Sequence, residues 1–102
     1  MIHVNRNGLT VKITGHAESA EKGKDLICAS ASILFYTLVE NVDRMQRESK
    51  CKAQIKALEG DAEVKVIASP DYHDEVTKVI NTIMVGYEIL AEEYPEYLSI
   101  DA

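Results

Sequence analysis

Apolar and polar positions alternate along the start of the chain. Apolar side chains occupy every second position of residues 2–4 and 9–13, and residues 5–8 (NRNG) between them are typical of a turn. A repeat of two residues indicates a strand with one buried face, so we expect a β-hairpin here. The small and charged residues at 17–24 predict a loop.

Beyond that loop the apolar residues change to helical spacing. Asp25 is a good N-cap, and we expect a long helix from Asp25 to about Glu48. One apolar stripe runs along it, formed by Ile27, Ala31, Leu34, Leu38, Val42 and Met45. The helix is also apolar outside this stripe, at Leu26, Ile33, Phe35, Tyr36 and Val39. Such a helix must be covered on several sides, by the sheet on one and by a second helix or a second subunit on another.

The second half of the chain repeats the first by pattern. Residues 51–57 and 62–68 alternate around a turn signal at Gly60-Asp61, which predicts a second hairpin. Ser69-Pro70-Asp71 ends this hairpin and starts a helix, with either Ser69 or Asp71 as its cap. The stripe of this helix consists of Val76, Val79, Ile80, Ile83, Tyr87, Leu90 and Tyr94, and Pro95 ends it. The predicted order is ββαββα, an α+β fold with two helices packed on one face of an antiparallel four-stranded sheet.

Composition limits what this fold does. The 102 residues suffice for one domain, which we place at 1–102, and 46% of them are apolar. The net charge of −6 and the absence of a basic stripe argue against direct binding of nucleic acid and allow attraction of a basic protein. No uninterrupted apolar run reaches the roughly 18 residues of a membrane helix. We expect no membrane association and, without a signal sequence, a cytoplasmic location with free thiols at Cys28 and Cys51.

The chemistry-bearing residues of the first half are His16 and Cys28. His16 comes after a strand, preceded by the conformationally free Gly15. Cys28 falls in the first turn of the long helix, where unpaired N–H groups and the helix dipole favour a thiolate. Ser32 lies one turn later on the same side. From spacing alone, an inert buried thiol and a surface histidine explain these residues at least as well as a catalytic pair.

The remaining candidates favour structural roles. Cys51 fits the buried alternation of its strand, while His3 and His73 are expected in solvent. No C-x-x-C or H-x-x-x-H spacing is present, so we expect no metal, no cofactor and no dithiol redox chemistry.

The stretch around these two residues resembles the signature of a bacterial family, the ribosomal-processing cysteine proteases called Prp. That signature is G-H-A, a short loop, and then G-x-D-[IL]-[VI]-C-A-x-x-S. Here Gly15-His16-Ala17 is followed by GKDLICASAS at 23–32. The length and the ββαββα order also match, so the resemblance covers essentially the whole chain. One departure is the segment 18–22 (ESAEK), which lacks the aromatic residue that family members commonly carry before the glycine.

The resemblance implies a specific activity. Family members remove an N-terminal extension from large-subunit ribosomal protein twenty-seven in Firmicutes and related bacteria, and they form homodimers. By this resemblance Cys28 is the nucleophile and His16 the general base and acid. Supporting roles fall to Gly15, Gly23, Asp25 and Ser32.

The mechanism needs oxyanion donors, and the Cys28 N–H and an amide near Gly23 are the candidates. We expect residues 17–24 to close over the peptide and to complete the site only then. The alternatives are a non-catalytic ribosome-associated binding or assembly module on the same fold and a thiol enzyme of another reaction type.

Overall fold

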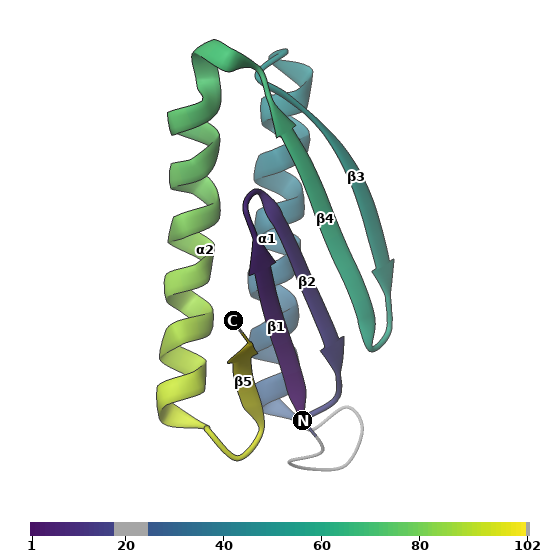
Figure 1. The fold of residues 1–102 in the computed structure, drawn as a ribbon. Helices are drawn as coiled ribbons and strands as arrows, with labels where there is room; N and C mark the ends of the chain where they lie inside the picture. The colour runs from purple at the N-terminus through teal and green to yellow at the C-terminus, as the bar shows by residue number, and fades with distance from the viewer. Residues whose placement is uncertain (18–24, 102) are drawn as a thin grey trace.

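The first hairpin is longer than its sequence pattern indicates. The structure is a computed structural model that describes residues 1–17 and 25–101. Strands β1 (Ile2–Asn7) and β2 (Thr10–Gly15) pair antiparallel (Figure 1). Residues 5–7, which were expected in the turn, continue β1 and pair with residues 10–12 of β2. Gly8, with a φ of +61°, takes the turn instead, because it adopts this left-handed backbone conformation without steric strain.

Helix α1 (Leu26–Arg47) begins and ends where the sequence predicts, with Asp25 as its N-cap and Glu48 as its C-cap. Its buried stripe follows the predicted one except at Phe35, which is buried where Leu34 was expected. Leu34 is half-buried and lies against Gly86 of the second helix, where any side chain would meet it. By length and composition alone α1 would qualify as a membrane span, a test that core helices also pass, and here its stripe packs in the core.

The second half contains β3 (Cys51–Leu58), β4 (Asp61–Ala68), the short 3-10 helix η1 (Pro70–Tyr72) and α2 (His73–Glu93). The turn between β3 and β4 is formed by Glu59 and Gly60, one residue earlier than expected. Ser69 precedes η1 without capping it, because its hydroxyl donates to the Ser49 carbonyl oxygen instead.

The sheet differs from the prediction: it has five strands in mixed orientation, in the order β3-β4-β2-β1-β5. The added strand β5 (Leu98–Asp101) follows α2 and runs parallel to β1, so the element order is ββαββαβ. β1 would otherwise leave a row of unpaired backbone groups at the sheet edge. The Ile2 nitrogen bonds the Tyr97 carbonyl oxygen at 2.8 Å, and Leu98 is only 1% exposed. Four residues are too short for a clear alternation pattern, which is why the sequence did not indicate this strand.

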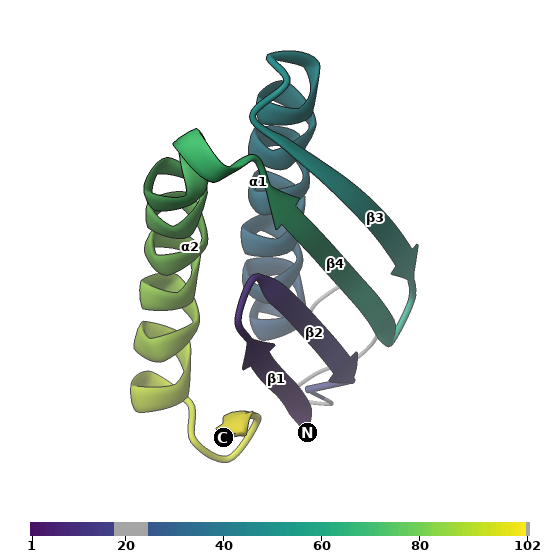
Figure 2. The same cartoon turned by 45° about the horizontal axis from the view of Figure 1, so that its top comes forward.

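The two helices pack side by side on one face of the sheet (Figure 2). The core between the layers contains apolar side chains from both helices and from all five strands. The start of α1, the end of β2 and the β3–β4 turn meet at one end of the molecule (Figure 1). This end carries the residues that the sequence singled out.

Candidate active site

His16 follows directly after β2, where the chain leaves the sheet. Gly15 ends the strand with a φ of +88°, and a Cβ atom there would lie 2.2 Å from the carbonyl oxygen of Met1. Only glycine fits without moving the start of β1. The Met1 nitrogen donates a hydrogen bond of 2.5 Å to the His16 carbonyl oxygen. Met1 therefore contacts the backbone of both Gly15 and His16.

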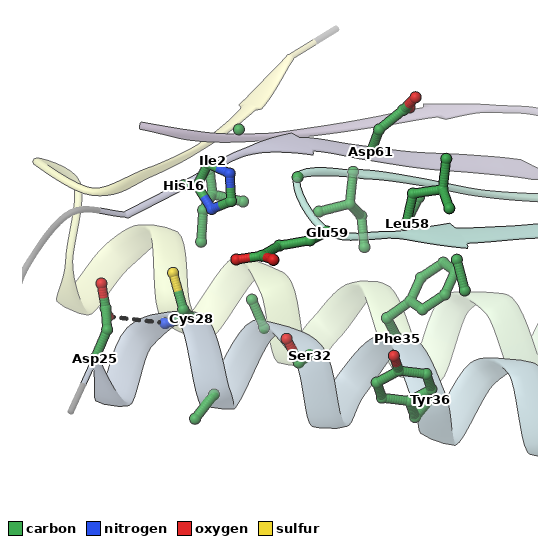
Figure 3. A pocket seen from close by; sticks show the side chains of 17 residues that line it. Ile2, His16, Asp25, Cys28, Ser32, Phe35, Tyr36, Leu58, Glu59 and Asp61 are labelled. Atoms are coloured by element: carbon green, nitrogen blue, oxygen red, sulfur yellow. Dashed lines mark hydrogen bonds between the residues drawn. The ribbon is translucent and has the colours of Figure 1, made fainter. Parts of the chain in front are cut away.

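Cys28 lies in the first turn of α1, held there by the Asp25 cap. The Asp25 Oδ1 atom accepts hydrogen bonds from the backbone nitrogens of Ile27 and Cys28, each at 3.0 Å. Figure 3 shows the bond from Cys28. The predicted capping role of Asp25 is confirmed. The Cys28 N–H, one of the two candidate oxyanion donors, is thereby engaged by the cap, and its role toward an oxyanion stays a prediction.

The Cys28 sulfur has a different backbone partner. The Ala17 nitrogen, directly after His16, donates a hydrogen bond of 3.3 Å to Sγ. Ala17 is buried and Cys28 is half-buried, so this bond is sheltered from water. The Ala17 amide and the start of α1 both present positive partial charge to the sulfur.

His16 and Cys28 line the same pocket, which has a volume of about 660 Å³. Its walls come from the end of β2, the first half of α1 and the β3–β4 turn (Figure 3). Away from Cys28 the pocket is lined by the apolar groups of Phe35, Tyr36 and Leu58. Tyr36 lies eight positions after Cys28 on the helix, a rise of about 12 Å. The pocket is therefore long enough for several residues of an extended peptide, at about 3.3 Å each.

His16 and Cys28, the candidate catalytic pair, line one pocket without a hydrogen bond between their side chains in the part of the chain that the structure describes. Among the residues that the structure describes, the Cys28 sulfur accepts a hydrogen bond from Ala17 and none from the His16 ring. Ser32 lines the pocket one turn after Cys28, as its spacing predicted. Gly23 and the rest of the segment 18–24 lie outside the described residues, so the predicted loop closure and the oxyanion donor near Gly23 stay predictions.

The charged groups of the pocket wall are acidic. Among the described lining residues they are Asp25, Glu59 and Asp61. Lys56, outside the wall, bonds the Asp61 carboxylate at 2.5 Å, and this bond lowers the pKa of Asp61 below its ordinary value. The pocket wall therefore presents acidic side chains, which favour a basic ligand.

Two wall residues, Glu59 and Gly60, were missed in the sequence. β2 and β4 pair so that Thr14 lies opposite Asp61, which brings the β3–β4 turn beside the end of β2. Alternation identifies strands but does not say which strands pair. The only local signal was the glycine of the turn, and it did not indicate that the turn faces His16.

The other candidates lie elsewhere. Cys51 is 3% exposed, its thiol lies 3.8 Å from the Val42 carbonyl oxygen, and burial raises its pKa above the ordinary value, so it has the structural role that its strand pattern indicated. His3 lies 3.1 Å from the Asp101 carboxylate and His73 is exposed. Within residues 1–17 and 25–101, no three His, Cys, Asp or Glu side chains are grouped closely enough to hold a metal ion.

A half-buried thiol at a helix start, sharing a pocket with a histidine, is the arrangement of a thiol hydrolase. The model of the family described as cysteine protease Prp matches residues 1–99. The chain therefore belongs to this family and is a cysteine protease, which confirms the resemblance seen in the motif.

Known relatives share the full length of the chain. The ribosomal processing cysteine protease Prp of Staphylococcus aureus is 24% identical over 102 residues, covering 98% of this chain and 93% of its own. The crystal structure of that organism's essential ribosomal processing protease Prp with a covalently linked product peptide matches with a TM-score of 0.76. It is 22% identical and covers 98% of this chain and 95% of its own. The complex of that protease with a substrate peptide matches with a TM-score of 0.69 at 21% identity and the same coverage. At these identities the two crystal structures establish the shared fold.

Proposed function

We propose that this protein is an endopeptidase that removes the N-terminal extension of large-subunit ribosomal protein twenty-seven. Cys28 acts as the nucleophile, with His16 as general base and acid. Curated relatives of similar length are named ribosomal processing cysteine proteases, and the Staphylococcus aureus protease was crystallised with a substrate peptide. The acidic pocket wall supports a basic ribosomal protein as the substrate.

The observation that carries the proposal is the hydrogen bond from the Ala17 nitrogen to the Cys28 sulfur. It ties the residue after His16 to the helix start that holds Cys28. The nucleophile and its base therefore approach the same pocket from opposite sides. An inert core cysteine would instead have the environment of Cys51, buried and remote from this pocket.

The reaction proceeds in two half-reactions. His16 takes the Cys28 proton, and the sulfur attacks the scissile carbonyl carbon, whose oxygen becomes an oxyanion. The C–N bond then breaks as protonated His16 gives its proton to the leaving amine, which leaves a thioester on Cys28. A water molecule attacks the thioester and gives one proton to His16. That proton returns to the Cys28 sulfur as the acid product leaves.

The oxyanion requires a donor close to the sulfur. The Ala17 N–H, 3.3 Å from Sγ, would serve if it turned from the sulfur to an oxygen on the carbon that Sγ attacks. The Cys28 N–H would serve only if a bound substrate displaced Asp25 from it.

We further propose that the protein works as a homodimer. Three large apolar side chains of α1 support this, because Leu26, Ile33 and Tyr36 are 78%, 63% and 56% exposed. Sedimentation equilibrium tests it: the unmodified protein should sediment as a dimer and Ile33→Asp as a monomer, whereas a monomeric unmodified protein would refute it.

A peptide assay tests the proposed activity. A synthetic peptide spanning the N-terminal extension and the first residues of the mature ribosomal protein is incubated with the protein, and its fragments are weighed. We expect one cut for this peptide, none for its scrambled version, and none with His16→Ala or Cys28→Ala. Tight binding without cleavage by the unmodified protein would instead support a binding module.

A further inference from the structure

The β3–β4 turn makes a close contact with the His16 imidazole. Gly60 has a φ of +72°, and a Cβ atom at this position would lie 2.6 Å from His16 Nε2, 3.1 Å from Cε1 and 3.4 Å from Cδ2. The imidazole therefore occupies the space that a side chain at position 60 would need. A second glycine turn, at Gly8, has nearly the same φ of +61° but nothing within 4 Å of its Cβ position.

The backbone fixes this turn relative to His16. The Gly15 nitrogen donates a hydrogen bond of 3.0 Å to the Gly60 carbonyl oxygen. β2 and β4 pair up to Thr14 and Asp61, so the bond continues their ladder by one step. The turn therefore cannot move away from Gly15, the residue before His16, without breaking the pairing of β2 and β4. In this way Gly60 provides a rigid wall on one side of a side chain that is otherwise exposed.

We propose that Gly60 is a positioning residue for His16. It limits the orientations of the imidazole and keeps the ring on the Cys28 side of the pocket. This inference rests on the proposed role of His16 as general base and acid. The absence of a side chain at position 60 is then a requirement of the active site in addition to a requirement of the turn.

A side chain at position 60 should move the imidazole while leaving the fold intact. The atoms that it would meet are at the tip of the His16 side chain, which rotates away easily. Gly15 is the contrasting case, because there the obstacle is the backbone oxygen of Met1. Gly60→Ala also places alanine at a positive φ, a penalty that Gly8→Ala shares. The difference between these two variants therefore isolates the contact with His16.

Steady-state cleavage of the extension peptide provides one test. We expect Gly60→Ala to lower kcat by about 10- to 100-fold with KM within about 3-fold, since misplacing a catalytic group by about 1 Å has effects of this size. Gly8→Ala should keep kcat within about 2-fold. Gly60→Asn and Gly8→Asn repeat the comparison with a residue that tolerates a positive φ, in case the alanine variant does not fold. Equal kcat values in either folded pair would overturn the proposal.

A second readout does not depend on the substrate. The chain has three histidines, and the loss of one imidazole signal in His16→Ala assigns the NMR resonance of His16. We expect this resonance to shift in Gly60→Ala and to stay in place in Gly8→Ala. An unchanged His16 resonance in Gly60→Ala would refute the contact even if the unmodified protein cleaved no peptide. Absence of cleavage together with a shifted resonance would refute the proposed function and leave the contact established.

Discussion

Replacing Asp25 by alanine should loosen the helix that presents Cys28. The Asp25 carboxylate satisfies two backbone amides at 3.0 Å, and no acidic residue in the first turn of α1 could take its place. Loss of an N-cap of this kind typically lowers the free energy of unfolding by about 1 kcal/mol. Loss of the negative charge at the positive end of the helix dipole adds roughly 0.3–1 kcal/mol. We therefore expect a total loss of about 1–2 kcal/mol for Asp25→Ala.

Urea unfolding followed by circular dichroism measures this difference, and thermal unfolding should show a drop of roughly 4–8 °C for each kcal/mol. Asp25→Asn is the matched control. Asparagine keeps a side-chain oxygen that can accept from the same amides but has no charge, so only the dipole contribution of roughly 0.3–1 kcal/mol should disappear. Equal stabilities of Asp25→Ala and the unmodified protein would show that the cap does not hold this helix. Equal losses in both variants would show that only its charge matters.

Two further predictions concern the cysteines and the core. Iodoacetamide at mildly alkaline pH should alkylate Cys28 much faster than Cys51, because Cys51 is 3% exposed and burial raises its pKa; comparable rates in a peptide map would contradict the burial argument. Tyr87→Phe should lower the free energy of unfolding by about 1 kcal/mol, since the fully buried hydroxyl donates to the Ala31 carbonyl oxygen at 2.9 Å. Unchanged urea unfolding of Tyr87→Phe would show that this bond contributes no net stability.

The parts of the fold that depend on neighbouring residues were predictable from the sequence. Asp25 caps amides two and three positions ahead of it, so its role follows from local chemistry alone. The position of Cys28 in the first helical turn follows from the same residue. The strand alternations identified four strands, and the helical stripe of α1 was wrong only where Phe35 replaced Leu34.

What the sequence did not indicate depends on pairing across long separations. β5 exists because β1 has an open edge and Leu98 finds a place in the core, and neither fact is visible in four residues. Gly60 reaches His16 because β2 pairs with β4, and the alternation of the two strands does not contain that choice. Two pocket residues, the candidates His16 and Cys28, were therefore predictable from the sequence. The contribution of the β3–β4 turn to the pocket wall became visible only in the folded chain.

The central claim is that Cys28 performs the chemistry, and the two thiols of the chain allow a direct test. Intact ribosomal protein twenty-seven with its extension is incubated with Cys28→Ala and, separately, with Cys51→Ala, and removal of the extension is followed by mass spectrometry. We expect Cys51→Ala to cleave at a rate near that of the unmodified protein and Cys28→Ala not to cleave. Cleavage that persists in Cys28→Ala would contradict the central claim.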